Sequence, residues 1–351
     1  MTRQAIPPGF QASSSSQNLE TEFLNRHPSH VSTPITKAFL LGAGLGTRLR
    51  PLTNELPKPL IPVFHRPLIH HALDHCLAAG IREFAINTHH LPEKWDELFR
   101  GCGVSVQAVP AASGEDHISH GQYRDTPITF FHEPDLLETG GGIKNIEEWI
   151  CGEPIVVYNG DILSTLDLNR LIATHSDSEM EVTLAVRSTG PALHIAVGGA
   201  RVTDIHRLLG VAEGTHQFTG IYCLNPEFLG RLPAREKVSV IPTFLELAKG
   251  GNLGASLHDE GQWLDLGCRE AYLDAHRIGN LGNPIHQEAT IDPTAMVEAS
   301  VVGPGASIGP DAVVLNTVLW PNTQIAGGAQ LTNCIVYSST PATGAHHNAD
   351  L

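Results

Sequence analysis

Between residues 37 and 187, short apolar runs alternate with longer segments whose apolar residues recur at helical spacing. Pro67 and Gly80 enclose the first of these longer segments, as proline and glycine commonly do at helix ends. The pattern predicts helices over 67–80, 92–100 and 141–150, and strands over 37–41, 82–87, 104–109, 128–133 and 154–161. Alternating strands and helices indicate an α/β fold, here a Rossmann-like, mixed but mostly parallel sheet with helices on both faces.

Predicted strands lie closer together beyond residue 180. They cover 181–187, 201–207 and 216–225, which indicates an antiparallel insertion or edge in the same domain. Segments 240–250 and 269–280 predict the helices that complete this domain, which we place at residues 35–283.

A six-residue period replaces this pattern in the last part of the chain. It runs in three stretches, with a one-residue slip between them: Ile291 and Val297, then Val302, Ile308, Val314 and Trp320, then Ile325 and Leu331. Such a period is typical of a β-helix, although a loop-rich β-tail with accidental periodicity is the alternative. We predict a hexapeptide-repeat β-helix of two to three coils over 284–340 and a flexible tail over 341–351.

The first segment, residues 1–34, is rich in Ser, Gln, Asn and Pro and shows no apolar period. Such a composition does not supply enough apolar surface for a core, so we expect a disordered N-terminal arm.

Composition narrows the possible partners. With 22 basic and 37 acidic residues the formal net charge is −15, so the chain is a poor binder of nucleic acids or anionic membranes. The sequence shows neither a secretory signal nor the ~18 consecutive apolar residues of a membrane span. Its six cysteines show neither Cys-x-x-Cys spacing nor clustered histidines at zinc-site spacing. We therefore expect a cytoplasmic protein with free thiols.

Candidate chemistry follows the first strand, in "GAGLGTRLRPLT" and the nearby "PKP". Glycines let backbone N–H groups approach a polyphosphate, while Arg48 and the proline-flanked Lys58 supply fixed cations. A P-loop is excluded because Gly46 is followed by Thr47 and Arg48. The dinucleotide fingerprint is excluded because Thr47 replaces its third glycine and the prolines forbid its helix.

These two motifs resemble the sugar-1-phosphate nucleotidylyltransferases, whose signature is a strand, G-x-G-T-R-L-x-P-L-T and a downstream P-K-P. Further along, "EPDLLETGGGIKN" resembles the second nucleotide-contacting loop of that family. "VVYNGDI" and "WLDLGCREAYLDAH" resemble the two segments that carry its metal-binding aspartates. The resemblance covers roughly residues 37–280, and the hexad tail is similar to the left-handed β-helix of several members. It implies a fold of the nucleotide-diphospho-sugar transferase type.

The resemblance implies that a sugar 1-phosphate attacks the α-phosphorus of an NTP, giving an NDP-sugar and pyrophosphate. The attacking phosphate is already an anion at pH 7, so catalysis requires positioning and charge neutralisation rather than a protein base. By analogy Arg48, Lys58 and Asp161 are catalytic, with Arg48 on the leaving pyrophosphate and Lys58 on the α-phosphate or sugar phosphate. Asp161 and Asp265 would bind Mg²⁺, which commonly takes one or two protein carboxylates.

The same analogy assigns the substrate contacts. Those expected for the nucleotide are Leu41, Gly42, Ala43, Gly44, Gly46, Thr47, Asn87, Thr139, Gly140 and Gly141. Those expected for the sugar are Asn159, Thr219 and Gly220.

One departure from the family pattern bears on the substrate. Many hexose-type members carry Glu-Lys-Pro before the "G-[IL]-Y" strand, but the corresponding stretch here reads "RVTDIHRLLG" and lacks that lysine. Glucose- and thymidylyl-type enzymes are therefore disfavoured. The remaining candidates are mannose- or heptose-1-phosphate guanylyltransferases and N-acetylmuramate-1-phosphate uridylyltransferases, and the hexad tail favours the mannose type. We thus expect GTP or UTP and a sugar 1-phosphate as partners.

Rival interpretations of another class remain open. The chain could be a non-catalytic subunit that senses an NDP-sugar, although the intact Arg48, Lys58, Asp161 and Asp265 argue against it. An acyltransferase site in the β-helix would need more coils and a histidine between residues 291 and 337, where none occurs. The short tail also suggests a homo-oligomer formed through the β-helix.

Overall fold

The computed structural model describes residues 33–101, 107–109, 117–279 and 281–351. The predicted N-terminal arm therefore lies outside the described residues, except for its last two positions. Among the described residues, none of the helices combines the length and the hydropathy that a membrane span requires.

An eleven-stranded sheet forms the centre of the first domain, in the order β11-β12-β14-β10-β13-β8-β1-β4-β7-β6-β5. Strands β8, β1, β4 and β7 are parallel neighbours, whereas β13 is inserted antiparallel between β8 and β10. This confirms the mostly parallel mixed sheet and the antiparallel insertion. The bounds are β1 (Lys37–Leu41), β4 (Glu83–Thr88), β5 (Gln107–Val109), β6 (His117–Tyr123), β7 (Thr126–His132), β8 (Ile155–Asn159), β10 (Val182–Arg187), β11 (Ile195–Gly198), β12 (Arg201–Ile205), β13 (Gln217–Leu224) and β14 (Leu253–Leu257).

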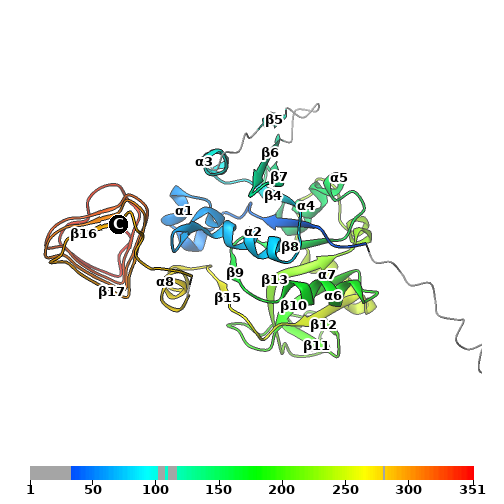
Figure 1. The fold of residues 1–351 in the computed structure, drawn as a ribbon. Helices are drawn as coiled ribbons and strands as arrows, with labels where there is room; N and C mark the ends of the chain where they lie inside the picture. Colours follow the sequence, from blue (N-terminus) through cyan, green and yellow to red (C-terminus); the bar gives the residue numbers. More distant parts are fainter. Residues whose placement is uncertain (1–32, 102–106, 110–116, 280) are drawn as a thin grey trace, which may run out of the picture. The chain divides into compact units, whose positions relative to one another are not determined.

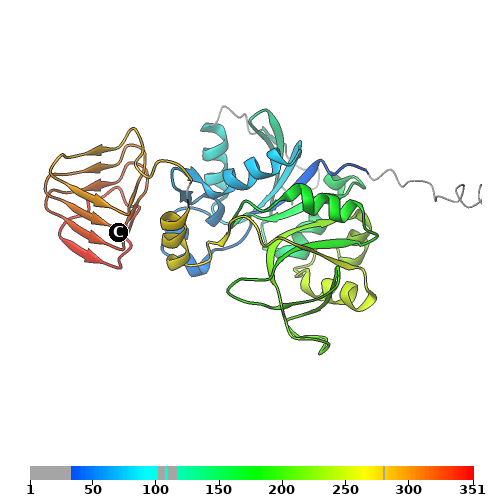
Figure 2. The same cartoon turned by 60° about the horizontal axis from the view of Figure 1, so that its bottom comes forward.

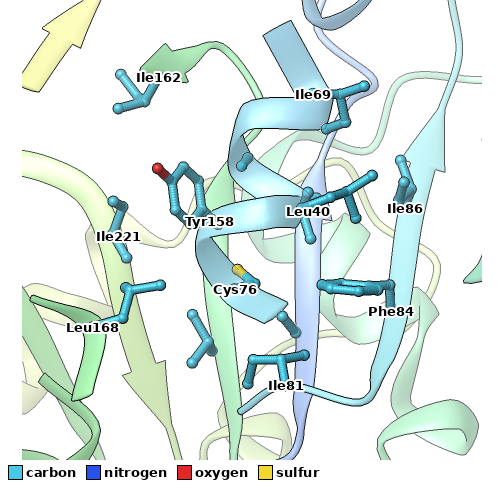
Figure 3. Packing of buried hydrophobic residues seen from close by; sticks show 14 of the residues in the cluster. Leu40, Ile69, Cys76, Ile81, Phe84, Ile86, Tyr158, Ile162, Leu168 and Ile221 are labelled. Atoms are coloured by element: carbon cyan, nitrogen blue, oxygen red, sulfur yellow. The ribbon is translucent and has the colours of Figure 1, made fainter. Parts of the chain in front are cut away.

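Helices cover both faces of this sheet (Figure 1). Along β1, Ala38 and Leu40 face one helical layer and Phe39 faces the other, because successive strand residues point to opposite faces. The first layer contains α2 (Leu68–Ala78), α3 (Pro92–Gly101) and α6 (Leu168–Ser176). The second contains α4 (Glu138–Asn145), α5 (Glu147–Ile150) and α7 (Ile241–Gly250). Figure 3 shows Ile69 and Cys76 of α2 packed above Leu40, Phe84 and Tyr158 of the sheet.

Short elements surround the carboxyl ends of the central strands. After β1 come η1 (Thr47–Leu49), α1 (Leu52–Glu55), η2 (Lys58–Leu60) and the small hairpin of β2 (Pro62–Val63) and β3 (Arg66–Pro67). A second small ribbon pairs β9 (Ile162–Ser164) with β15 (Trp263–Asp265). The remaining elements of this domain are η3 (Pro226–Arg231) and α8 (Arg269–Ile278). Among the predicted site residues, these segments carry Thr47, Arg48, Lys58 and Asp265.

The last part of the chain is a parallel β-helix with three faces. Figure 1 shows its triangular outline, and Figure 2 shows its strands stacked from coil to coil. The first face holds β16 (Thr290–Ile291), β19 (Ser307–Ile308) and β22 (Gln324–Ile325). The second holds β17 (Met296–Glu298), β20 (Val313–Leu315), β23 (Gln330–Thr332) and β25 (Ala345–His347). The third holds β18 (Val301–Val302), β21 (Val318–Leu319) and β24 (Ile335–Val336).

The coils of the β-helix take 17 residues rather than three complete hexads, except that the last step, from β23 to β25, takes 15. Thr290 pairs with Ser307, and Ser307 pairs with Gln324, 17 positions further along the chain each time. A corner with positive φ recurs at the same interval, at Ala299, Asn316 and Asn333. The missing eighteenth residue explains the slip in the six-residue period of the sequence.

The predicted flexible tail over 341–351 was wrong. Strand β25 pairs with β23, Ala342 bridges to Ile325, and Asp350 bridges to Ile335, so this segment adds to the β-helix. Backbone ladder bonds such as Ala342 N–H to Gln324 O (2.8 Å) hold it in place. Its sequence lacks the apolar hexad, and so the apolar pattern did not reveal it.

Candidate active site

The glycine loop leaves β1 at the carboxyl edge of the sheet and is shaped by its own contacts. Gly42 N–H donates to Asn87 Oδ1 (2.8 Å), which ties the loop to the end of β4. Gly46 is left-handed (φ 59°), and a Cβ there would lie 2.7 Å from Thr53 Cγ2. Only glycine meets both demands at position 46, so this residue shapes the loop.

A cavity of about 460 Å³ opens beside this loop, at the carboxyl ends of β1, β4 and β8. In open α/β sheets this edge is where ligands bind. Eleven predicted site residues line it: Leu41, Ala43, Gly44, Gly46, Thr47, Arg48, Lys58, Asn87, Thr139, Asn159 and Asp161. Further lining residues, not predicted from the sequence, are Pro59, Leu136, Glu138, Ser239 and Gly267.

Lys58 joins the two predicted metal ligands. Its side chain is buried, and its Nζ lies 2.6 Å from Asp161 Oδ2 and 3.5 Å from Asp265 Oδ1. Asp161 follows β8 in the turn before β9, and Asp265 ends β15 opposite Ile162 of β9. The β9–β15 ribbon thus brings together two carboxylates that are far apart in the sequence.

The carboxylate pair fits a hard divalent cation. Asp265 Oδ1 is buried, and the described residues give it no hydrogen-bond donor, although Lys58 Nζ is within ion-pair range. Both side chains are partly exposed, Asp161 at 35% and Asp265 at 39%, and Asp161 lines the cavity. Two carboxylates suffice for Mg²⁺, which fills its other positions with phosphate and water. Within the described ranges no group of three or more His, Cys, Asp or Glu could hold a metal ion.

Arg48 lies close to Asp265. Its side chain is exposed and lines the cavity. A Cβ built on Gly267 would lie 2.8 Å from Arg48 Nη2 and 3.0 Å from Asp265 Oδ1, so the guanidinium and the carboxylate meet over this glycine. The two cations and two carboxylates predicted from the sequence are therefore neighbours in the structure.

A buried carboxylate that sequence reasoning missed supports Asn87. Glu133 accepts hydrogen bonds from Asn87 Nδ2 (2.7 Å) through Oε1 and from Leu137 N–H (3.0 Å) through Oε2. Burial raises the pKa of Glu133, although both donors act in the opposite direction. With its amide nitrogen bound to Glu133, Asn87 must turn its oxygen to Gly42. The only sequence signal was that Glu133 begins the quoted "EPDLLETGGG" segment.

Two glycines predicted to contact the nucleotide instead form hydrogen bonds with another segment of the chain. The N–H groups of Gly140 and Gly141 donate to Val238 O at 2.8 and 3.1 Å. A Cβ on Gly141 would lie 2.4 Å from Glu236 O, so glycine is needed there for packing. The neighbouring Leu136, Glu138 and Thr139 line the cavity.

The predicted sugar contacts divide in a similar way. Asn159 lines the cavity, and Gly220 lies against it in a left-handed conformation, where a Cβ would be 2.7 Å from Asn159 Nδ2. Thr219 is fully buried and its hydroxyl donates to Ala185 O (2.8 Å). The hydroxyl of Thr219 therefore holds β13 to β10 instead of facing a sugar.

The model of the nucleotidyl transferase family matches residues 37–279, which is more than half of the chain. The chain belongs to the nucleotidyl transferase family. The matched range coincides with the α/β domain and includes every predicted site residue. The resemblance read from the glycine loop and from "PKP" is thereby confirmed.

The chain is also similar to individual curated proteins. Mannose-1-phosphate guanylyltransferase of Mycobacterium tuberculosis is 28% identical over 304 residues, which cover 79% of this chain and 77% of that protein. UTP–glucose-1-phosphate uridylyltransferase of Synechocystis is also 28% identical, with 69% of this chain and 62% of the relative covered. Mannose-1-phosphate guanyltransferase of Yarrowia lipolytica is 28% identical, with 68% and 62% covered. The chain thus spans less than two thirds of the latter two relatives.

Solved structures confirm the fold. A UDP-glucose pyrophosphorylase from Acinetobacter baumannii superposes with a TM-score of 0.54 at 20% identity, covering 69% of this chain and 92% of that one. A putative glucose-1-phosphate thymidylyltransferase from Bacillus anthracis gives a TM-score of 0.56 at 20% identity, covering 70% and 97%.

Proposed function

We propose that the protein transfers a nucleotidyl group from an NTP to a sugar 1-phosphate, releasing pyrophosphate, and that GTP and mannose 1-phosphate are its substrates. The observation that carries this proposal is the convergence of Lys58, Asp161, Asp265 and Arg48 at the cavity beside the glycine loop. Family membership supports the reaction class.

In the proposed reaction an oxygen of the sugar phosphate forms a bond to the α-phosphorus of the NTP, and the bond from that phosphorus to the α,β-bridging oxygen breaks. That oxygen leaves as a terminal oxygen of pyrophosphate. The glycine loop would place its backbone N–H groups along the triphosphate. Arg48, with its exposed guanidinium, would bind the departing pyrophosphate oxygens. Lys58 would hold the α-phosphate or the incoming phosphate, because its buried ammonium has a fixed position.

Asp161 and Asp265 would hold Mg²⁺, which when bound neutralises phosphate charge as it builds up on the reacting groups. The chain itself contributes orientation of these two carboxylates, through the β9–β15 pairing. No side chain is required as a general base, because the attacking phosphate oxygen is already anionic.

Two observations support the mannose type. The similarity to the mycobacterial guanylyltransferase runs over 304 residues, longer than the matched family region, so it extends beyond the α/β domain. The lysine of the hexose-type Glu-Lys-Pro motif is absent from "RVTDIHRLLG". The uridylyltransferase relative is equally identical, so UTP belongs in the test.

The deciding experiment is a matrix of four NTPs against mannose, glucose and N-acetylmuramate 1-phosphates, with pyrophosphate release as the readout. We expect GTP with mannose 1-phosphate to give the highest kcat/KM. Asp161→Asn should abolish turnover while leaving the thermal unfolding temperature close to that of the wild type. The matched control is Asp177→Asn, at an exposed aspartate beyond α6, which should retain full activity.

Each alternative has its own outcome in this matrix. A preference for UTP with N-acetylmuramate 1-phosphate would replace the substrate assignment and keep the reaction class. Nucleotide binding by calorimetry without pyrophosphate release from any pair would instead support the regulatory subunit. Retained activity in Asp161→Asn would refute the role of this carboxylate.

A further inference from the structure

One face of the β-helix packs against the segments that carry the active-site residues. In β18, β21 and β24 the second residue points into the interior of the β-helix, where it joins the buried cluster of Val302, Leu319 and Val336. The first residue of each strand points outward. These outward residues, Val301, Val318 and Ile335, are stacked in register and buried.

The outward stripe is covered by the catalytic domain. Val301, Val318 and Ile335 share a buried cluster with Leu49 and Leu52, which continue the glycine loop, and with Ile61, Val63, Leu266 and Tyr272. An apolar stripe on a free β-helix would be open to water. Here its burial joins the β-helix to the chain segments on either side of Lys58 and Asp265.

A buried chain of hydrogen bonds runs from the β-helix toward Lys58. Trp320 Nε1–H donates to Tyr272 Oη (3.0 Å), and the Tyr272 hydroxyl donates to Pro62 O (2.6 Å). Tyr272 is fully buried and lies on α8. Pro62 begins β2, and only Ile61 separates it from the single turn of η2 that begins at Lys58. The Tyr272 hydroxyl therefore links the β-helix to the backbone that carries the ammonium group.

A second connection runs from the β-helix toward Asp265. Arg269, the first residue of α8, donates from Nε to Asp350 Oδ1 (2.7 Å) and from Nη2 to Asn333 O (2.6 Å). Both acceptors belong to the β-helix. Arg269 lies four positions beyond Asp265 in the chain, so its guanidinium fixes the exit of the β15 segment.

We propose that the β-helix is a positioning element of the active centre, which fixes the Lys58 segment through Trp320 and Tyr272 and the Asp265 segment through Arg269. The segments that it would fix have little secondary structure of their own. The η2 turn and strands β2 and β15 have only two or three residues each, so few backbone bonds of their own hold them. A displacement of about 1 Å at the reacting atoms can lower a rate by about 10²-fold. The kinetic part of this inference rests on the proposed function.

Two variants test the proposal: Tyr272→Phe removes the hydroxyl and both of its hydrogen bonds, and Trp320→Phe replaces the indole donor with a smaller aromatic ring. In Tyr272→Phe and Trp320→Phe we expect hydrogen exchange of the Leu60, Ile61 and Phe64 amides to accelerate about tenfold, while amides of β4 keep their wild-type rates. At saturating substrates kcat should fall at least about fivefold in Tyr272→Phe, within the range expected for a small displacement of reacting groups. The double variant should be no slower than Tyr272→Phe alone, because Trp320 acts through the Tyr272 hydroxyl.

Tyr337→Phe is the matched control. Tyr337 packs on Trp320 in the same cluster, but its hydroxyl has no hydrogen-bond partner among the described residues. This variant should match the wild type in exchange and in kcat. Equal effects of Tyr337→Phe and Tyr272→Phe would refute a specific role for the Tyr272 hydroxyl.

The exchange and kinetic readouts separate the possible failures. Unchanged exchange at residues 60–64 in Tyr272→Phe would overturn the positioning role, and so would faster exchange with unchanged kcat. If the wild type releases no pyrophosphate from any NTP and sugar 1-phosphate, the proposed function fails. In that case the exchange experiment still decides whether the β-helix fixes this segment.

Discussion

A substitution at Gly44 can test whether the glycine loop binds the triphosphate without disturbing how the loop folds. A Cβ built on Gly44 meets no atom within 4 Å, and its φ lies outside the left-handed region. The neighbouring Gly42 and Gly46 differ, because a Cβ on either would lie 2.7 Å from another atom of the chain. The fold therefore tolerates a methyl group at position 44, whereas a triphosphate lying along the loop would collide with it.

The expected magnitudes follow from this geometry. Gly44→Ala should leave the free energy of unfolding unchanged or raise it by about 0.4–1 kcal/mol, because alanine restricts the unfolded chain. If the loop backbone contacts phosphate, the added methyl group acts like overpacking, which typically costs about 1–3 kcal/mol. At about 1.4 kcal/mol for each factor of ten, the dissociation constant of the NTP should rise by about 5- to 150-fold.

The assay combines urea unfolding with calorimetric titration of GTP and initial rates of pyrophosphate release. Gly46→Ala serves as the contrasting variant, since its left-handed φ and its contact with Thr53 should lower stability by at least about 1–2 kcal/mol. An unchanged dissociation constant in a stable Gly44→Ala protein would refute the reasoning. It would mean that the phosphates bind away from this loop.

Three further predictions address packing, sugar binding and pH. Gly141→Ala should lower the free energy of unfolding by about 1–3 kcal/mol, measured in urea, because its Cβ would lie 2.4 Å from Glu236 O, whereas exposed Gly230→Ala should have little effect. Thr219→Val should lower the free energy of unfolding by about 1 kcal/mol, because the hydrogen bond to Ala185 O is lost. The KM for the sugar 1-phosphate should stay within about twofold of the wild type, and a large rise in it would mean that Thr219 contacts the sugar. Burial lowers the pKa of His276 from 6.5 to about 4. As the pH drops from about 6.5 to 4, this histidine takes up a proton in the unfolded chain but not in the folded one, so the free energy of unfolding falls. Over that pH range the free energy of unfolding of His276→Gln should fall by up to about 3 kcal/mol less than that of the wild type, measured by chemical unfolding at each pH. Equal losses in both proteins would show that His276 does not cause the pH dependence.

The sequence predicted most of the fold because its patterns are local. Local sequence alone indicates the conformation of the buried strand at 37–41, of the helix that begins after Pro67 and of the repeated hexads. The family motifs then placed Lys58, on the phosphates, and Asp161, on the metal, in one active site, and the structure brings their side chains within 2.6 Å.

What the sequence did not predict depends on contacts between distant segments. Glu133 becomes part of the site only because Asn87 and Leu137 both donate to it, and neither contact has a local signature. Gly140 and Gly141 were expected at the nucleotide by analogy with the second nucleotide-contacting loop of the family, but here they make room for the backbone at 236–238. Glycine identity alone does not distinguish these two uses.

The 17-residue repeat of the β-helix restricts how the length of this part of the chain can change. Adding or deleting 17 residues would insert or remove a whole coil and keep Val301, Val318 and Ile335 on the side that contacts the catalytic domain. Grafting an idealised coil of three hexads would add one extra residue, and a one-residue shift within a strand reverses its inner and outer faces. Variation in length by whole coils is therefore compatible with an intact docking face, while insertions of other sizes have to be absorbed at the corners.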